Sequence, residues 1–349
     1  MRNSSKLFIV IFSILFSFNA SALDFKLNEK PAPSPLNLIE FFGEFELNGE
    51  KVIIREDGGR LHAIFNPTVD GTRPENLEDW PLSFISPAKY TYSFKGEFAT
   101  FIFQYDKDKN VKALVINDEI YQRNNIEPRD GQSFKVTLDK SIEEYISDAL
   151  NATPPKQKGE FREQELVDVT DVLENVRLDV RYAGTNNFLN APTYSQAKSF
   201  FQRPALMALN RANKKFNDMG YGILVHDAYR PWYVTKVFWD ATEGFERDFV
   251  ADPESGSKHN MGSAIDLTLY DLKTGEVIKM VGTYDEMSDR SYPDYMGGTA
   301  LERWYRDLLR TTIEAEGFKV VSNEWWHYDH EEWRKYPILN KTFEELSTN

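Results

Sequence analysis

Cysteine is missing from this chain of 349 residues. Its absence excludes disulfide bonds, a thiolate nucleophile, a cysteine-type zinc site and a lipid-modified cysteine. Positive charge is also scarce, because 41 lysines and arginines stand against 55 aspartates and glutamates, for a formal net charge of -14. Nucleic acids and anionic membrane surfaces require a basic patch, so neither is expected as the main partner. Small zwitterionic substrates remain compatible with this charge.

Long apolar runs are likewise scarce. The longest, from Leu7 to Phe18, has twelve residues, whereas a membrane span needs about 20. A short basic segment precedes this run, and the small residues of a cleavage site follow it at Ala20-Ser21-Ala22. We therefore expect residues 1–22 to be a signal peptide cleaved after Ala22. The mature protein is expected in the bacterial periplasm without a stable membrane anchor, although full secretion would leave the same pattern.

The chain has room for about two domains. Short segments with the composition and spacing of strands follow one another between residues 37 and 124: 51–55, 61–65, 90–94, 99–105 and 111–116. They predict an antiparallel meander, closed as a small barrel or sandwich. Residues 23–150 are thus predicted to be a β-rich domain of unknown role. A linker rich in Pro, Lys and Gly is expected at 151–160, and a second domain at 161–349.

The second domain alternates helical and strand-like patterns. Helices are expected at 196–219, after Pro231 and at 300–316, with Gly220 and Gly317 as left-handed caps. Strands are expected at 221–226, 263–270, 318–321 and 325–328. The order predicts an α+β fold with an antiparallel sheet and helices to one side.

Two motifs in this domain supply imidazoles and carboxylates: Ser257, His259 and Asp266 in S-x-H-x6-D, and Glu324 to His327 in E-W-W-H. Two neutral imidazoles and one carboxylate suit a catalytic Zn²⁺ with a fourth position left for water. His259 and Asp266 are seven residues apart and would point to opposite faces of a straight strand. They converge only if the chain bends, and Gly262 permits that bend. Without a metal, Asp266 would be a hydrogen-bonded aspartate at a strand edge.

Glu324 and His327 would also diverge on a straight strand, so a bulge or turn is expected between them. His330 is a competing ligand. We favour His327, because His330 lies in an acidic stretch at 329–332 and is expected to be a solvated surface histidine. Glu324 would then be free to take a proton from water as a general base.

Arg230 follows the strand predicted at 221–226, and two roles fit its position. It could form a structural ion pair with Asp227. In a metallopeptidase it would instead point into the cleft and hydrogen-bond the oxyanion of the tetrahedral intermediate.

Several segments, in the same order, resemble the zinc D-alanyl-D-alanine dipeptidases associated with vancomycin resistance. They are R-Y-A-G-T-N-N-F from Arg181, D-A-Y-R-P from Asp227, S-K-H-N-M-G-S-A-I-D-L-T-L-Y from Ser257, T-G-E from Thr274 and E-W-W-H-Y from Glu324. The resemblance covers about half of the chain. It implies an α+β zinc peptidase fold, shared with cell-wall D,D-carboxypeptidases and hedgehog signalling domains.

The resemblance also implies one Zn²⁺ per chain and a role for each matching residue. His259, Asp266 and His327 correspond to the zinc ligands. Glu324 corresponds to the catalytic base, and Arg230 to the group that polarises the scissile carbonyl.

Tyr182, Ser257 and Asp285 correspond to positions that hold the ends of the substrate, with Asp285 facing a free ammonium. The implied reaction is hydrolysis of a D,D-dipeptide such as D-alanyl-D-alanine to free D-amino acids. The resistance enzymes act in the cytoplasm and lack both a signal peptide and a β-rich extension. An exported relative is therefore expected to serve cell-wall turnover or salvage.

Two other functions stay open, as does the oligomeric state. A D,D- or L,D-carboxypeptidase acting on muropeptides would need an open groove instead of a closed ammonium site. A non-catalytic zinc module that binds wall fragments or a protein partner would need neither Glu324 nor Arg230.

Overall fold

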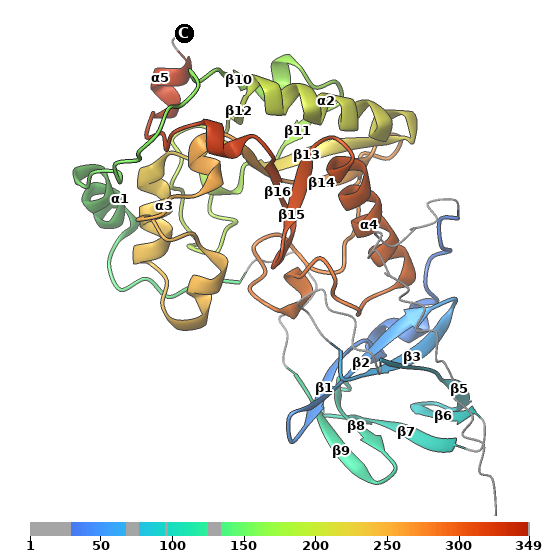
Figure 1. Ribbon diagram of the computed structural model, residues 1–349. Coiled ribbons are helices and arrows are strands. Elements are labelled where there is room, and N and C mark those ends of the chain that lie inside the picture. The colour runs from blue at the N-terminus through green and yellow to red at the C-terminus, as the bar shows by residue number, and fades with distance from the viewer. Residues whose placement is uncertain (1–28, 68–76, 95–96, 125–133, 348–349) are drawn as a thin grey trace, which may run out of the picture.

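The computed structural model describes residues 29–67, 77–94, 97–124 and 134–347 (Figure 1). The predicted signal peptide, residues 1–22, lies outside these ranges. Within them, no helix has the length and apolar character needed to cross a membrane. The described chain contains one large sheet in its N-terminal part and a smaller sheet with most of the helices in its C-terminal part.

Nine antiparallel strands form the N-terminal sheet. They are β1 (Gly43–Leu47), β2 (Glu50–Asp57), β3 (Arg60–Phe65), β4 (Glu78–Pro81), β5 (Ser83–Ser86), β6 (Lys89–Phe94), β7 (Glu97–Tyr105), β8 (Val111–Ile116) and β9 (Glu119–Arg123). The spatial order is β4-β3-β2-β1-β9-β8-β7-β6-β5. Trp80 of β4 stacks on Tyr92 of β6 with ring centroids 4.3 Å apart, so the sheet curls until its two ends approach.

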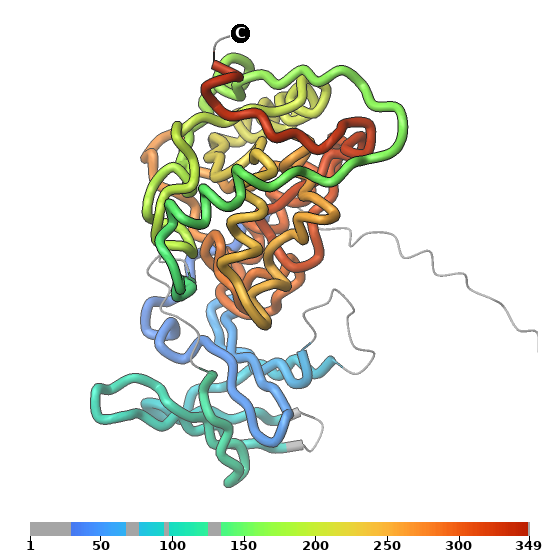
Figure 2. The backbone as a smooth tube through the Cα atoms, turned by 90° about the vertical axis from the view of Figure 1, so that its left-hand side faces the viewer, coloured from blue at the N-terminus to red at the C-terminus, as the bar shows by residue number. Residues whose placement is uncertain are grey.

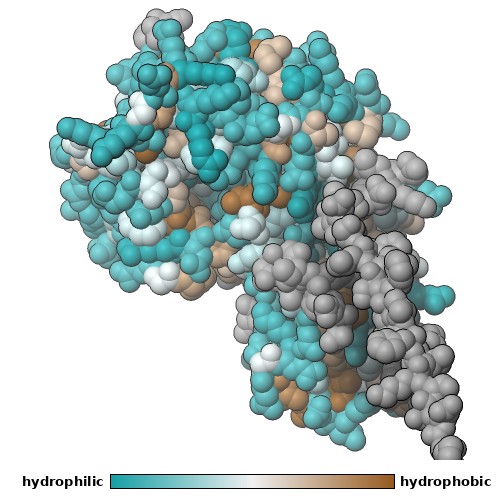
Figure 3. Space-filling view, in the orientation of Figure 1, coloured by the Kyte–Doolittle hydropathy of each residue, from teal (hydrophilic) through white to brown (hydrophobic). Residues whose placement is uncertain are grey.

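The expected meander is thus present, and the short strands β1, β4, β5 and β9 extend it. Alternate residues such as Phe45, Val52 and Phe101 fill the inside of the curled sheet. Figure 3 shows apolar side chains among the hydrophilic ones on the outer surface of this part, and the C-terminal part has similar apolar patches in the same view.

The second sheet has five strands in the order β11-β13-β14-β16-β15. Their bounds are β11 (Arg177–Leu178), β13 (Tyr221–Asp227), β14 (Ala264–Asp271), β15 (Phe318–Val321) and β16 (Glu324–His330). All neighbours are antiparallel except β11 and β13. A separate pair joins β10 (Leu166–Asp168) to β12 (Phe200–Gln202). The α+β class expected from the sequence is confirmed.

Helices cover both faces of the smaller sheet. They are α1 (Ile142–Asn151), α2 (Arg203–Asp218), α3 (Trp232–Asp240), α4 (Ala300–Glu314) and the short α5 (Phe343–Ser347). The helices α2 and α4 contact each other and the strands. In Figures 1 and 2, α3 and α1 lie on the opposite side of the sheet from α4. The expectation that all helices lie to one side was therefore wrong for this pair.

The helix expected at 196–219 begins at Arg203, because residues 200–202 pair with β10 instead. Pro204 lies in its first turn, where proline loses no hydrogen bond. Its predicted left-handed cap is confirmed at Gly220, with φ 87°. Thr299 and Glu302 form a capping box that fixes the start of α4.

Candidate active site

His259 lies in a short 3-10 helix, Lys258–Met261, directly before β14. Gly262 follows with φ 64°, a left-handed conformation that turns the chain into the strand. A Cβ atom at this position would also lie 2.5 Å from Leu166 Cδ2. The bend predicted here is therefore confirmed, and it brings His259 Nε2 within 3.3 Å of Asp266 Oδ1.

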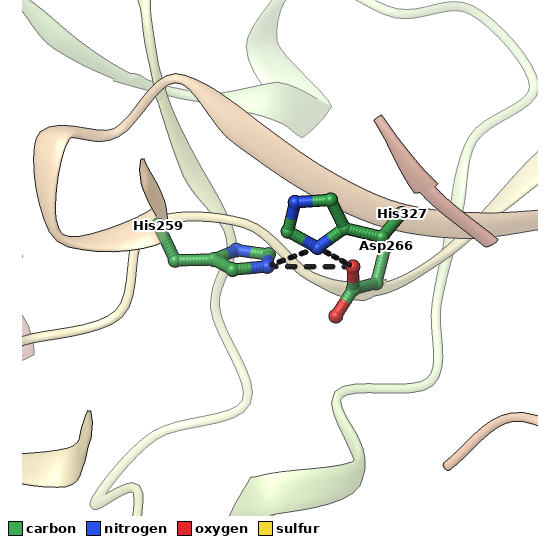
Figure 4. Close-up of side chains that lie close together, drawn as sticks. All are labelled: His259, Asp266 and His327. Atoms are coloured by element: carbon green, nitrogen blue, oxygen red, sulfur yellow. Dashed lines mark hydrogen bonds and ion pairs between the residues drawn. The ribbon is translucent and has the colours of Figure 1, made fainter. Parts of the chain in front are cut away.

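His327 enters the same cluster because β16 is irregular. Val320 pairs with Tyr328, whereas the next residue, Val321, pairs with Glu324. The irregularity predicted between Glu324 and His327 is thus confirmed. His327 Nδ1 lies 3.0 Å from His259 Nε2 and 3.0 Å from Asp266 Oδ1. Figure 4 shows the three side chains converging from the 3-10 helix, β14 and β16.

Hydrogen bonds on the far side of each ring set which nitrogens face one another. His259 Nδ1 donates to the Ala228 carbonyl at 2.6 Å, and His327 Nε2 donates to Asp329 Oδ1 at 2.9 Å. When both rings are neutral, the facing nitrogens carry lone pairs, as does Asp266 Oδ1. Three buried acceptors that converge in this way repel one another unless a cation lies among them.

The spacing of these acceptors fits a metal ion. Ligands about 2.0–2.2 Å from a tetrahedral zinc ion lie roughly 3.4 Å from one another. The observed separations are 3.0 to 3.3 Å. Two imidazoles and a carboxylate are also a donor set that suits zinc. The site could hold one divalent ion with a position left open.

Tyr284 is a site residue that the sequence reasoning missed. Its hydroxyl donates to Asp266 Oδ2 at 3.0 Å and so orients the carboxylate from outside the cluster. Tyr284 precedes Asp285 in the chain, which was the one available signal. Nothing in the local pattern showed that its side chain turns toward β14.

Arg230 forms the structural ion pair that was one of the two roles expected for it. Its Nε and Nη2 lie 2.9 and 2.8 Å from Asp227 Oδ2, and the side chain also borders the cavity beside the metal cluster. Asp227 is itself held by the Tyr194 hydroxyl at 2.7 Å. The ion pair therefore fixes the guanidinium at the edge of the cavity.

The cavity beside the cluster has a volume of about 240 Å³. Pockets for drug-sized ligands are about 300 to 1,000 Å³, so this one suits a small substrate. Its apolar lining includes Phe188, Phe238, Phe249, Val250 and Trp326. Glu324 also lines it, with Oε2 3.6 Å from His327 Nδ1. Burial raises the pKa of Glu324 to about 7, which suits a group that accepts and returns a proton near neutrality.

Tyr182, Ser257 and Asp285 all border this cavity. The Tyr182 hydroxyl donates to Asp285 Oδ1 at 3.1 Å, while no described residue hydrogen-bonds to Asp285 Oδ2. Burial and the nearby carboxylates raise the pKa of Asp285 well above its usual value. A cationic group in the cavity would relieve this repulsion. Ser257 caps the 3-10 helix by accepting a hydrogen bond from the His259 N–H at 3.3 Å.

His330 is not a solvated surface histidine, and that expectation was wrong. It is buried, its ring packs against Phe318 with centroids 5.0 Å apart, and its Nδ1 accepts a hydrogen bond from the Glu332 N–H. Position 330 shares the parity of the buried Tyr328 on β16, and Glu331 and Glu332 lie beyond the end of the strand. It lies outside the cluster formed by His259, Asp266 and His327.

Comparison with known proteins covers the C-terminal part of the chain. Residues 162–348 match peptidase family M15, described as D-ala-D-ala dipeptidase. A D-alanyl-D-alanine dipeptidase of Escherichia coli (strain K12) is 31% identical over 179 residues, which are 51% of this chain and 91% of the relative.

Two further relatives carry the same name. The one from Enterococcus faecium is 34% identical over 188 residues, 45% of this chain and 87% of the relative. The one from Streptomyces coelicolor is 32% identical over 181 residues, 46% of this chain and 88% of the relative. The nine-stranded sheet precedes the residues that match the family.

Proposed function

The chain belongs to the D-Ala-D-Ala dipeptidase family of metallopeptidases, and on this premise we propose that it hydrolyses D-alanyl-D-alanine to two D-alanines with one Zn²⁺ per chain. One observation carries the proposal. Three converging metal-ligand atoms, the carboxylate of Glu324 and the guanidinium of Arg230 all meet at one small cavity.

His259, Asp266 and His327 are the residues proposed to hold the ion. Zinc bound there supplies a Lewis acid that makes water nucleophilic near neutral pH. Glu324 takes the proton of the attacking water and passes it to the leaving amine. The pKa of about 7 that burial gives this carboxyl allows both transfers.

Arg230 is proposed to donate hydrogen bonds to the carbonyl oxygen as negative charge develops on it. Its two contacts with Asp227 hold the plane of the guanidinium in advance. Such preorganisation means that little reorientation is needed at the moment of reaction.

The other end of the cavity supports a substrate with a free amino group. Asp285 presents an oxygen with no hydrogen-bond partner among the described residues, and Tyr182 fixes the carboxylate from the other side. An ammonium placed there would pair with a buried carboxylate, which is a strong, charge-assisted interaction. This feature favours a dipeptidase over a carboxypeptidase, whose substrate continues beyond that point.

The test compares two substrates of the zinc-loaded chain, D-alanyl-D-alanine and its N-acetylated form. We expect kcat/KM to be at least about 100-fold lower for the acetylated peptide, because Asp285 loses its partner. Equal or faster hydrolysis of the acetylated peptide would instead favour a carboxypeptidase. A zinc-loaded chain inert on D,D- and L,D-peptides would favour the non-catalytic zinc module.

We also propose that the reaction takes place outside the cytoplasm, in the turnover or salvage of cell-wall dipeptides. The support is the signal-peptide pattern of residues 1–22. Cell fractionation with N-terminal sequencing tests it. The expected result is a periplasmic protein that begins at Leu23, and an intact Met1 in the cytoplasmic fraction would refute it.

A further inference from the structure

Strand β2 is buried on both of its faces. Val52 and Ile54 belong to the core of the nine-stranded sheet, whereas Ile53 belongs to the buried cluster of the C-terminal part. Ile64, the register partner of Ile53 on β3, belongs to the same C-terminal cluster. The nine-stranded sheet therefore shares a hydrophobic core with the catalytic part.

An ion pair next to these isoleucines reaches the segment that joins β14 to α4. We call residues 279–299 the Asp285 loop. Lys51 of β2 places its Nζ 2.8 Å from Asp289 Oδ2 in this loop. Glu44 of β1 is buried close to both Lys51 and Asp289.

A second attachment lies where the Asp285 loop ends. Glu56 of β2 is only 1% exposed. Its N–H donates to the Gly298 carbonyl at 3.0 Å, and its Oε2 accepts from the Ala300 N–H at 3.0 Å. Arg303 Nη2 donates to the Glu56 carbonyl at 2.9 Å. A carboxylate at the N-terminus of α4 is favoured by the helix dipole, so Glu56 fixes the point at which the loop becomes helix.

The Asp285 loop is internally braced between Asp285 and Asp289. Glu286 is buried and holds residues on both sides of it. Its carboxylate accepts from the Thr283 N–H at 2.9 Å, the Thr283 hydroxyl at 3.1 Å and the Ser288 hydroxyl at 2.6 Å, and pairs with Arg290. Residues 283–290, which include both Asp285 and Asp289, are therefore tied together by one buried carboxylate.

The observed backbone conformation and side-chain position of Asp285 are both energetically unfavourable. Its φ of 58° is left-handed, a conformation that is unfavourable for a residue other than glycine. Its carboxylate is also buried near the carboxylates of Asp266 and Glu324, which repel it. Both effects favour moving the side chain out of the cavity.

We infer that the nine-stranded sheet is a positioning device for the amino end of the substrate, in which Lys51 and Glu56 hold the Asp285 loop so that Asp285 faces the cavity. The inference rests on the proposed dipeptidase function, because only that function assigns an ammonium to Asp285. Lys51 and Glu56 are positioning residues, since they act through the loop.

The test measures KM and kcat of the full zinc-loaded chain on D-alanyl-D-alanine after Lys51→Met. We expect KM to rise about three- to thirtyfold, with kcat changed by less than about twofold. The reason is that Asp285, which binds the amino group of the substrate, is displaced, whereas the residues of the metal site are not. Zinc content should stay at the wild-type value. Lys51→Arg should restore the KM. Lys112→Met removes an exposed lysine from β8 of the same sheet and should leave both constants unchanged.

Asp289→Asn removes the same ion pair from the loop side and is the milder change. A folded, zinc-loaded Asp289→Asn variant with the wild-type KM would overturn the inference, whatever Lys51→Met does. A fall in kcat at constant KM would overturn it as well. Failure of the wild-type chain to release D-alanine would instead refute the proposed function, so the two failures can be told apart.

Discussion

The metal cluster is oriented one residue at a time by groups outside it. The Ala228 carbonyl accepts a hydrogen bond from His259 Nδ1, and Asp329 accepts one from His327 Nε2, so that each partner fixes which ring nitrogen carries the proton. The Tyr284 hydroxyl donates a hydrogen bond to Asp266. Such outer contacts raise ligand basicity and limit ring rotation. We expect them to determine how well the three proposed ligands bind an ion before any substrate arrives.

Tyr284→Phe should therefore weaken zinc binding about 10- to 100-fold, because Asp266 loses its donor while the ring stays in place. Competition with a chromogenic chelator measures the affinity. Tyr229→Phe is the matched control, since its hydroxyl is bonded to the Lys341 carbonyl, away from the cluster. Equal zinc affinities for the Tyr284→Phe variant and the wild-type chain would contradict this role.

Glu324→Gln keeps the size of the side chain and removes its ability to accept a proton. We expect kcat to fall by at least about 100-fold with one zinc per chain retained. Asp266→Asn should instead lower the zinc content, because it removes a ligand. Metal analysis beside steady-state kinetics separates the two outcomes. Substantial turnover by Glu324→Gln would exclude Glu324 as the base.

At the scale of elements, the sequence predicted the bends better than the element ends. The offset between His259 and Asp266 demanded a turn, and Gly262 was the residue able to make it. The start of α2 was misplaced because Phe200 and Phe201 fit both helical and strand periodicity, and only the pairing with β10 decides. The four- and five-residue strands β1, β4, β5 and β9 carry too short a pattern to stand out from turns.

Gly262→Ala should destabilise the turn before β14 in two ways. The left-handed backbone costs a non-glycine residue roughly 1–2 kcal/mol, and the new Cβ would meet Leu166 Cδ2 at 2.5 Å. Gly220→Ala is the control, because Gly220 has φ 87° but nothing within 4 Å of the added Cβ. Urea unfolding should show a smaller loss for Gly220→Ala, and only Gly262→Ala should weaken zinc binding. Equal behaviour of the two variants would contradict the account of the turn.

At the scale of the whole molecule, the sequence could not show how its two parts meet. The pattern Lys51-Val-Ile-Ile-Arg55 indicated a strand, but Ile53 could be assigned to a second core only once its partner Ile64 and the Asp285 loop were in place. Contacts between residues this far apart leave no local periodicity. The role of Tyr284 was hidden for the same reason, whereas the burial of His330 could have been read from its parity with Tyr328 on β16.

Removing residues 23–124 should lower the stability of the remaining chain, because the C-terminal cluster would lose Ile53 and Ile64. Burial of each isoleucine contributes about 1.5–3 kcal/mol, so the free energy of unfolding should fall by several kcal/mol. Urea unfolding of 125–349 against 23–349 measures the difference. Equal stability of the two chains would show that the sheet is only tethered to the catalytic part.

The most direct test of the whole account is the release of D-alanine from D-alanyl-D-alanine by the purified chain, before and after chelation. We expect activity that disappears when the metal is removed and returns with one equivalent of zinc per chain. Hydrolysis that survives complete chelation, or no D-alanine at any zinc concentration, would contradict it.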